Sequence, residues 1–312
     1  MLCGVLLGQE PTFRTTVPVV VLPVSVTDGK GKPVDGLSLE DFEVLDNGKP
    51  IQAKLDTADV LTSPLAIVVA IQTNDIADPA LMKIQKVGAI IGPLIAGERG
   101  KVSVITYSDR VTLRLKFTND PDEIGGAFKK LKSESSKGSI LLDAMEEALK
   151  LLGEQAPNSR RVVIFVGESK DRGSKTKLDD AFVHVQKQNV SVYPLVYSAY
   201  LTPFTTAAQD YKPRAGGFDL LAGISSIARL GKANTAEVLA ESSGGKKQSF
   251  QTLHALEETL AKLGEELHSQ YVLSFNADST TAGYHSLAVS VKARPELHLR
   301  TRPGYWVDRD AR

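Results

Sequence analysis

The sequence predicts an α/β protein, with a doubly wound, mostly parallel sheet inserted into a small β-sandwich-like domain that is built from both termini. Three observations support this fold class. Unbroken apolar runs alternate with helical periodicity in the middle of the chain, as is typical of strands buried on both faces. Both ends instead alternate apolar and polar residues, as half-buried antiparallel strands do. Neither end has enough strands to bury a core alone, so we expect the two ends to form one domain.

Residues 1–16 are expected to be a leader or the remnant of a signal peptide. The stretch "MLCGVLLGQEPTFR" is apolar up to Gly8-Gln9-Glu10 and resembles the back half of a secretory signal without its basic start. A disordered N-terminus is the alternative. The signal reading implies an extracytoplasmic location, either periplasmic or secreted. Cys3 is the single cysteine, so no intramolecular disulfide can form, and it does not lie in a convincing lipoprotein acylation motif.

Residues 17–62 have the character of antiparallel strands. "VPVVVLPVSVTD" (Val17–Asp28) is rich in valine and closes on the turn residues "DGKGKP". In "DFEVLDNGKPIQAKL" the pair Asn47-Gly48 favours a two-residue hairpin. Between these segments, Ser38 and Asp41 have the spacing of a capping box and predict a single capped turn.

From Pro64 onward, strand and helix patterns alternate. "LAIVVAI" (Leu65–Ile71) predicts a fully buried strand. Asp78 and Pro79 then predict the N-cap and first position of a helix, which Pro93 is expected to kink or end. Further strands are expected at 101–108, 111–118, 160–169 and 190–199, and further helices at 122–131, from 139 onward, and at 176–188.

The pattern changes twice more toward the C-terminus. Residues 200–217 lack periodicity and predict a long loop, whereas "TLHALEETLAKLGEELHS" repeats leucine at helical spacing. Alternating strand patterns return in "QYVLSFNAD", "YHSLAVSVKA" and "LHLRTRPGYW". We therefore assign 63–268 to the α/β domain, and 17–62 together with 269–312 to the β domain.

The composition argues against several functional classes. The 37 basic and 37 acidic residues cancel, and the absence of a basic block gives no electrostatic reason to expect nucleic acid as a partner. No apolar run approaches the roughly 20 residues of a membrane span. The glycines of "AGGFDLLAG" lack the preceding strand and the lysine of a phosphate-binding loop, so we expect no cofactor.

A hydrolase is the weakest of the functional hypotheses. Gly167-Glu168-Ser169 follows a buried strand and matches half of a nucleophile elbow, but Asp171 stands where the second glycine is needed. The histidines, His184, His254, His268, His285 and His298, are scattered and none pairs with another at metal-ligand spacing.

The order and spacing of five stretches resemble the von Willebrand factor A-related family that is common in acidobacterial genomes. The stretches are "VPVSVTDGKGKPVDGLSLEDFEVLDNGKP", "GSILLDAMEEAL", "LAESSGG", "SQYVLSF" and "RPGYW", and the resemblance covers nearly the whole chain. It implies a von Willebrand A-type, Rossmann-like domain with a role in protein binding or adhesion rather than in catalysis.

The resemblance also implies the position of a metal-ion-dependent adhesion site. In A domains a divalent ion is commonly held by an Asp-x-Ser-x-Ser loop, a threonine and an aspartate. At those positions this sequence has Gln72, Asn74 and Ile76 in the first loop, then Ser139, then Glu168. Glu168 alone keeps a charge and Ile76 offers no side-chain oxygen, whereas magnesium requires near-octahedral oxygen ligands. We therefore expect a degenerate site and no divalent metal.

The main functional hypothesis is a non-enzymatic, extracytoplasmic protein-interaction or scaffold protein whose partner is unknown. Metal-dependent adhesion through a variant site is the first alternative, and a hydrolase around Ser169 is the second. Loops at the carboxyl ends of the parallel strands are expected to converge on one partner-binding face. The candidate contact residues on these loops are Asn74, Asp75, Asp171, Tyr200, Phe204 and Tyr211.

Overall fold

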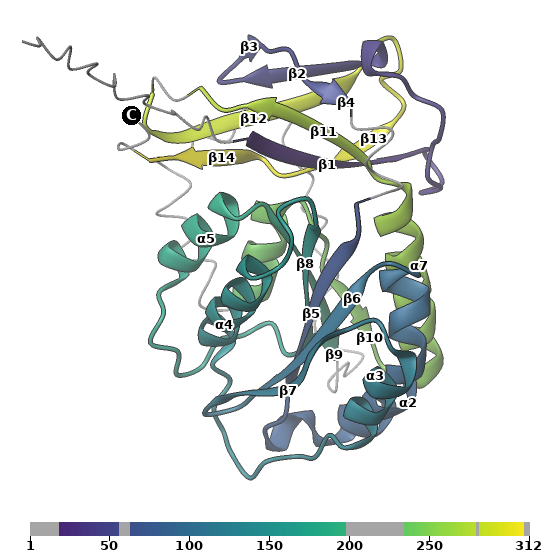
Figure 1. Ribbon diagram of the computed structural model, residues 1–312, viewed down its shortest axis with the longest axis vertical. Coiled ribbons are helices and arrows are strands. Elements are labelled where there is room, and N and C mark those ends of the chain that lie inside the picture. Colours follow the sequence, from purple (N-terminus) through teal and green to yellow (C-terminus); the bar gives the residue numbers. More distant parts are fainter. Residues whose placement is uncertain (1–18, 56–62, 198–233, 279–280, 309–312) are drawn as a thin grey trace, which may run out of the picture.

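A computed structural model describes residues 19–55, 63–197, 234–278 and 281–308. The described strands form a six-stranded mixed sheet and two four-stranded sheets. Figure 1 shows the two smaller sheets stacked at one end of the molecule and the mixed sheet, flanked by helices, at the other. The predicted fold class, an α/β unit with antiparallel sheets from the termini, is confirmed.

The mixed sheet has the strand order β10-β9-β8-β5-β6-β7 and is parallel except for β7, which pairs antiparallel with β6. Its central strand is buried along all of its length, as the apolar run predicts. The strands are β5 (Leu65–Gln72), β6 (Lys101–Tyr107), β7 (Val111–Thr118), β8 (Arg160–Gly167), β9 (Val190–Tyr197) and β10 (Gln248–Phe250).

Helices cover both faces of this sheet (Figure 1). One face packs against α2 (Asp78–Ile91), η3 (Gly92–Ala96), α3 (Pro121–Lys129) and α7 (Leu253–Ser269). The other face packs against α4 (Leu141–Gly153), α5 (Leu178–Lys187) and the helical residues 234–243. The two apolar layers between sheet and helices form the core of this unit.

The start and end of α2 differ in detail from the prediction. A short 3-10 turn, η2 (Asp75–Ala77), precedes the helix, so Asp78 is its first residue and Ala77 is its N-cap. After Ile91 the chain continues as the π-helical turn η3, which contains Pro93. Pro93 lacks a backbone N–H and cannot continue the α-helical hydrogen bonding, so the α-helix ends just before it.

The helical run Asp75–Ala96 is long and apolar enough to cross a membrane by length and composition, although the sequence pattern gave no sign of such a segment. Half of its apolar window is buried in the protein, and Leu81, Ile84 and Val87 of α2 belong to the core beneath the mixed sheet. The run is therefore explained as a core helix.

Each of the two smaller sheets combines strands from both ends of the chain. One has the order β13-β1-β11-β4 and the other β14-β12-β2-β3. β1 pairs antiparallel with β11, and β2 with β12, and a shared apolar core lies between the sheets. The strands are β1 (Val19–Thr27), β2 (Phe42–Asp46), β3 (Lys49–Pro50), β4 (Lys54–Leu55), β11 (Tyr271–Asn276), β12 (Gly283–Val291), β13 (His298–Arg300) and β14 (Gly304–Val307).

Two local predictions in the N-terminal segment are confirmed. Asn47 and Gly48 both have positive φ and join β2 to β3, as the mirror-image hairpin turn requires. Ser38 and Asp41 bracket the 3-10 turn η1 (Leu39–Asp41), in which the Ser38 N–H and hydroxyl both donate to the Asp41 carboxylate. The expected long loop at 200–217 lies outside the described residues.

Candidate functional site

The candidate site lies at the carboxyl end of the mixed sheet, on the side of the molecule away from the terminal sheets (Figure 1). The loops after β5 and β8 leave neighbouring parallel strands and meet there. The Gln72 side chain stands at the centre of this meeting point and is fully buried, with 0% of its surface exposed.

Gln72 connects the two loops through both ends of its amide. Its Nε2 donates to Asn74 Oδ1 at 2.9 Å and to Glu168 Oε2 at 3.0 Å. Its Oε1 accepts from the backbone N–H of Glu168 at 2.6 Å. The Gln72 side chain therefore joins the loop after β5 to the backbone of the loop after β8. Gly167 leaves the room for it, because a Cβ at that residue would meet Gln72 Oε1 at 2.5 Å.

The charge of Glu168 is neutralised by a residue of its own loop. Arg172 donates from Nη2 to Glu168 Oε2, the same oxygen that accepts from Gln72. Both side chains are only about one-third exposed, since Arg172 retains 32% and Glu168 29% of their surface. Glu168, the one acidic residue among the five metal-site positions, is thus already paired with a cation from the protein.

Ser139 lies beside this cluster but does not bond to Gln72. Its backbone exchanges two hydrogen bonds with Arg172, and its hydroxyl donates to the carbonyl of Lys170 at 3.2 Å. Asn74 donates to the carbonyl of Gly138 at 2.8 Å. The loops after β5 and β8 and the segment before α4 are therefore held to one another by their own polar groups.

These residues do not fit a divalent metal. Gln72 directs an amide N–H₂ group, a donor, at the two oxygens of Asn74 and Glu168 that would otherwise face a cation. Ile76 is apolar and 41% exposed, and Ser139 has its hydroxyl on a carbonyl. In the part of the chain that the structure describes, no group of three or more His, Cys, Asp or Glu residues could hold a metal ion.

The predicted contact residues divide into three groups: one exposed residue, two whose side chains bond within the fold, and three outside the described residues. Asp75 is exposed at the tip of the loop after β5, as a contact residue must be. Asn74 is fully buried, so its side chain is not available to a partner and that assignment is corrected. Asp171 caps the start of α4, where its Oδ1 accepts from the Leu142 N–H and from Ser174 Oγ. The third group, Tyr200, Phe204 and Tyr211, lies outside the described residues.

Ser169 does not form a nucleophile–base pair with any residue that the structure describes. Its hydroxyl oxygen is shielded from solvent and has no hydrogen-bond partner among the described residues. Because nucleophilic catalysis by serine needs a base within hydrogen-bond reach, the described geometry gives the hydrolase hypothesis no support.

A second polar cluster, which the sequence did not reveal, joins the mixed-sheet unit to the terminal sheets. Arg302, just before β14, is 3% exposed and reaches the C-terminal end of α5. Its Nη2 donates to the carbonyl of Gln186 at 2.6 Å and its Nη1 to Asn189 Oδ1 at 2.6 Å. Asn189 Oδ1 also accepts from the N–H of Val21 in β1, at 3.4 Å. Burial lowers the pKa of Arg302 to about 10.

The stretches "LAESSGG" and "RPGYW" meet in this cluster. Gly244 has a φ of +77°, and a Cβ there would meet the backbone N of Arg302 at 2.5 Å. A Cβ on Gly245 would collide with the carbonyl oxygen of Val192, so β9 excludes any side chain at that position. The glycines therefore serve close backbone packing. Both stretches carry the family resemblance, but no spacing in the sequence indicated that they lie in contact.

A partly buried ion pair lies at the same interface. Arg300 Nη2 and Glu266 Oε1 are 2.5 Å apart, and the Tyr193 hydroxyl donates to that oxygen at 2.8 Å. Burial alone would lower the pKa of Arg300, but the carboxylate of Glu266 raises it above its usual value. Gln270 donates to Tyr193 Oη at 3.0 Å and to Ser25 Oγ at 3.1 Å, which adds a strand of the N-terminal segment to the network.

Comparison with known proteins identifies the mixed-sheet unit. Residues 78–170 match the family profile of the von Willebrand factor type A domain. The chain therefore contains a von Willebrand factor type A domain, as the resemblance in the sequence predicted. The narrower likeness to the acidobacterial A-related family stays a prediction.

The solved structures that resemble this chain do so at low identity. A conserved hypothetical protein, BatB, from Bacteroides thetaiotaomicron matches at 14% identity with a TM-score of 0.46, over 65% of this chain and 98% of its own. An aerotolerance-related membrane protein from Bacteroides fragilis matches at 13% identity and a TM-score of 0.44, over 65% and 98% of the two chains. The von Willebrand factor domain of the type V pilus tip protein Mfa5 from Porphyromonas gingivalis matches at 13% identity with a TM-score of 0.31. This match covers 35% of this chain and 39% of the Mfa5 chain. A search of curated proteins found no match.

Proposed function

We propose that this protein is a non-enzymatic, extracytoplasmic protein-interaction module that binds its partner without a divalent metal. The observation that carries the proposal is the position of the Gln72 amide, which donates to Asn74 Oδ1 and Glu168 Oε2 where a cation would need those oxygens. Because Arg172 also neutralises Glu168, the face is preformed and does not depend on a metal ion to order it.

The binding surface that we propose is the rim around this cluster. Asp75 and Ile76 are exposed beside each other on the loop after β5, and Lys137 and Lys170 are exposed on the adjoining loops. A surface with an apolar residue among charges of both signs suits a protein partner more than a polyanion, since interfaces place apolar contacts within a polar rim. The extracytoplasmic location is part of the same proposal, because the first residues of the sequence resemble a secretory signal.

The experiment is capture of the partner from the native envelope fraction, with and without a chelator. Wild type is compared with Asp75→Lys/Ile76→Ser and with a control, Asp122→Lys, that changes an equally exposed acid at the start of α3. We expect the wild type and the control variant to capture the partner equally well with and without EDTA. The double variant should lose capture. Capture that requires magnesium or manganese would support metal-dependent adhesion, and capture that the double variant retains would place the interface elsewhere.

A further inference from the structure

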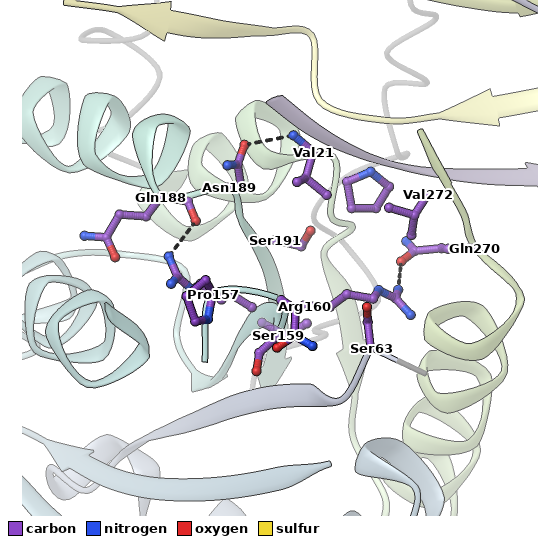
Figure 2. Close-up of a pocket in the computed structure, with 14 residues that line it drawn as sticks. Val21, Ser63, Pro157, Ser159, Arg160, Gln188, Asn189, Ser191, Gln270 and Val272 are labelled. Atoms are coloured by element: carbon purple, nitrogen blue, oxygen red, sulfur yellow. Dashed lines mark hydrogen bonds between the residues drawn. The ribbon is translucent and has the colours of Figure 1, made fainter. Parts of the chain in front are cut away.

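A pocket lies at the end of the mixed sheet opposite the proposed binding face. It measures about 190 Å³ and is enclosed by the amino ends of β8 and β9 and the strands β1 and β11 (Figure 2). It is smaller than the roughly 300–1,000 Å³ of pockets that hold drug-sized molecules, so its volume suits a small ion or metabolite fragment.

The charges around this pocket do not balance. Its lining includes Arg160 and Arg161 and contains neither aspartate nor glutamate. Neither arginine has a carboxylate within salt-bridge distance in the part of the chain that the structure describes. Two positive charges, carried on opposite faces of β8, therefore border this partly enclosed volume without a counter-charge from the described protein.

The hydrogen bonds of these guanidinium groups go only to neutral oxygens. Arg160 donates to the carbonyl of Leu267 at 2.8 Å and to Gln270 Oε1 at 2.6 Å. Arg161 donates to the carbonyl of Gln188 at 3.4 Å, which is a long contact. The Nε atoms of both arginines are shielded from solvent and have no acceptor among the described residues. A guanidinium group has five N–H donors, so each of these partly exposed side chains keeps donors that no described group accepts.

Neutral polar groups complete the lining. Ser63, Ser159 and Ser191 contribute hydroxyls, and Figure 2 shows Ser191 between Gln188 on one side and Gln270 on the other. Hydroxyls can donate to an oxyanion, and guanidinium groups match the geometry of phosphate, sulfate and carboxylate oxygens.

The electrostatic effect of Arg160 is visible on a neighbour. Partial burial lowers the pKa of His268, and the positive charge of Arg160 lowers it further. Burial also lowers the pKa of both Arg160 and Arg161 below the usual value of arginine. A negative charge in the pocket would offset these effects.

We propose that this pocket binds a small oxyanion, with Arg160 and Arg161 supplying the charge and the serine hydroxyls supplying further donors. The walls come from both units of the protein, since Val21, Pro23 and Val272 belong to the terminal sheets and the arginines to the type A domain. Binding therefore couples the two units and stabilises their arrangement. This site is independent of the proposed partner-binding face at the other end of the sheet.

The test is calorimetric titration of the full chain with inorganic phosphate, sulfate and acetate in turn, at constant ionic strength in chloride. We expect saturable binding of one phosphate or sulfate per chain; preference for acetate would assign a carboxylate as the natural ligand. Arg161→Gln should weaken binding at least about tenfold, because a charge-assisted contact is lost. Arg294→Gln, which changes an arginine 45% exposed on a distant turn, should leave it unchanged.

A second readout does not depend on any variant at the pocket. The titration midpoint of His268, followed by NMR, should rise when phosphate is added, because the anion offsets the charge of Arg160. Absence of saturable binding to the wild type overturns the proposal. So does equal affinity in the wild type and a folded Arg161→Gln variant, because the ion would then bind elsewhere.

Discussion

Arg302 and Gln186 lie 116 residues apart in the sequence and form a buried contact in which one guanidinium group bonds to both oxygens of one glutamine. The contact ties the segment between β13 and β14 to the last turn of α5. The carbonyl groups at the end of a helix carry partial negative charge, so this is a favourable place for a cation that has no carboxylate partner.

Arg302→Met should lower the stability of the protein by about 3 kcal/mol, because it removes the donor to both oxygens of Gln186 and leaves Asn189 Oδ1 with only the long contact from the Val21 N–H. Arg302→Lys should also be destabilising, since an ammonium group cannot reproduce the planar fork. Thermal unfolding followed by circular dichroism measures both. Arg294→Met is the matched control at an exposed arginine and should change the melting temperature little. A melting temperature of Arg302→Met equal to that of the wild type would contradict a stabilising role for the contact.

The metal site should be recoverable if the cluster is rebuilt. Replacing Gln72 by Asp, and Asn74 and Ile76 by Ser, supplies oxygen ligands, and Arg172→Gln frees Glu168 from its ion pair. We expect this fourfold variant to bind Mn²⁺ weakly, as measured by calorimetry, and the threefold variant that keeps Arg172 to bind less. Tight manganese binding by the wild type would refute our description of the cluster.

Two glycine-to-alanine substitutions in helices should change stability in opposite directions. Gly264 of α7 lies against η3, where a Cβ would collide with the carbonyl oxygen of Leu94. Gly264→Ala should lower the melting temperature, although alanine is the better helix former. A Cβ added at Gly126 of α3 would meet no atom within 4 Å, so Gly126→Ala should stabilise the protein by roughly 0.5–1 kcal/mol. A stabilising Gly264→Ala would show that α7 can shift away from η3.

The pKa of His268 should give the protein a measurable acid sensitivity. Burial and the charge of Arg160 lower its pKa in the folded state, so the unfolded chain takes up this proton first as the pH falls. His268 therefore contributes stability above its usual pKa, and that contribution is lost as the pH falls through the lowered folded-state value. His268→Asn should reduce the drop in melting temperature on mild acidification; an unchanged drop would assign the acid sensitivity to other groups.

Local structure could be predicted where residues a few positions apart decide it. Asn47-Gly48 predicts its hairpin because both residues accept positive φ, and the apolar run Leu65–Ile71 predicts a buried strand because no polar group interrupts it. The start of α2 was misplaced because Asp78 and Pro79 carry the usual signals of a helix start. The chain has already turned at Asp75, in a 3-10 turn that no residue pattern indicates.

The candidate site was only partly predictable for the same reason. The contact between Gln72 and the backbone of Glu168 follows from adjacent parallel strands, so the sequence could indicate it. The burial of Asn74 and the pairing of Arg172 with Glu168 depend on how the loops fold over each other, which no spacing rule supplies. The contact between Arg302 and Gln186 joins elements of two units and was beyond the reach of local patterns.

The interleaving of the two chain ends in the terminal sheets has a mechanical consequence. β1 near the N-terminus and β14 near the C-terminus both belong to these sheets, and the type A domain enters and leaves them as an insertion. A pull applied at residues 19 and 307 therefore acts first on the antiparallel ladders between β1 and β11 and between β12 and β14. The type A domain lies outside that load path, so its far face keeps its shape while the ends of the chain carry the tension.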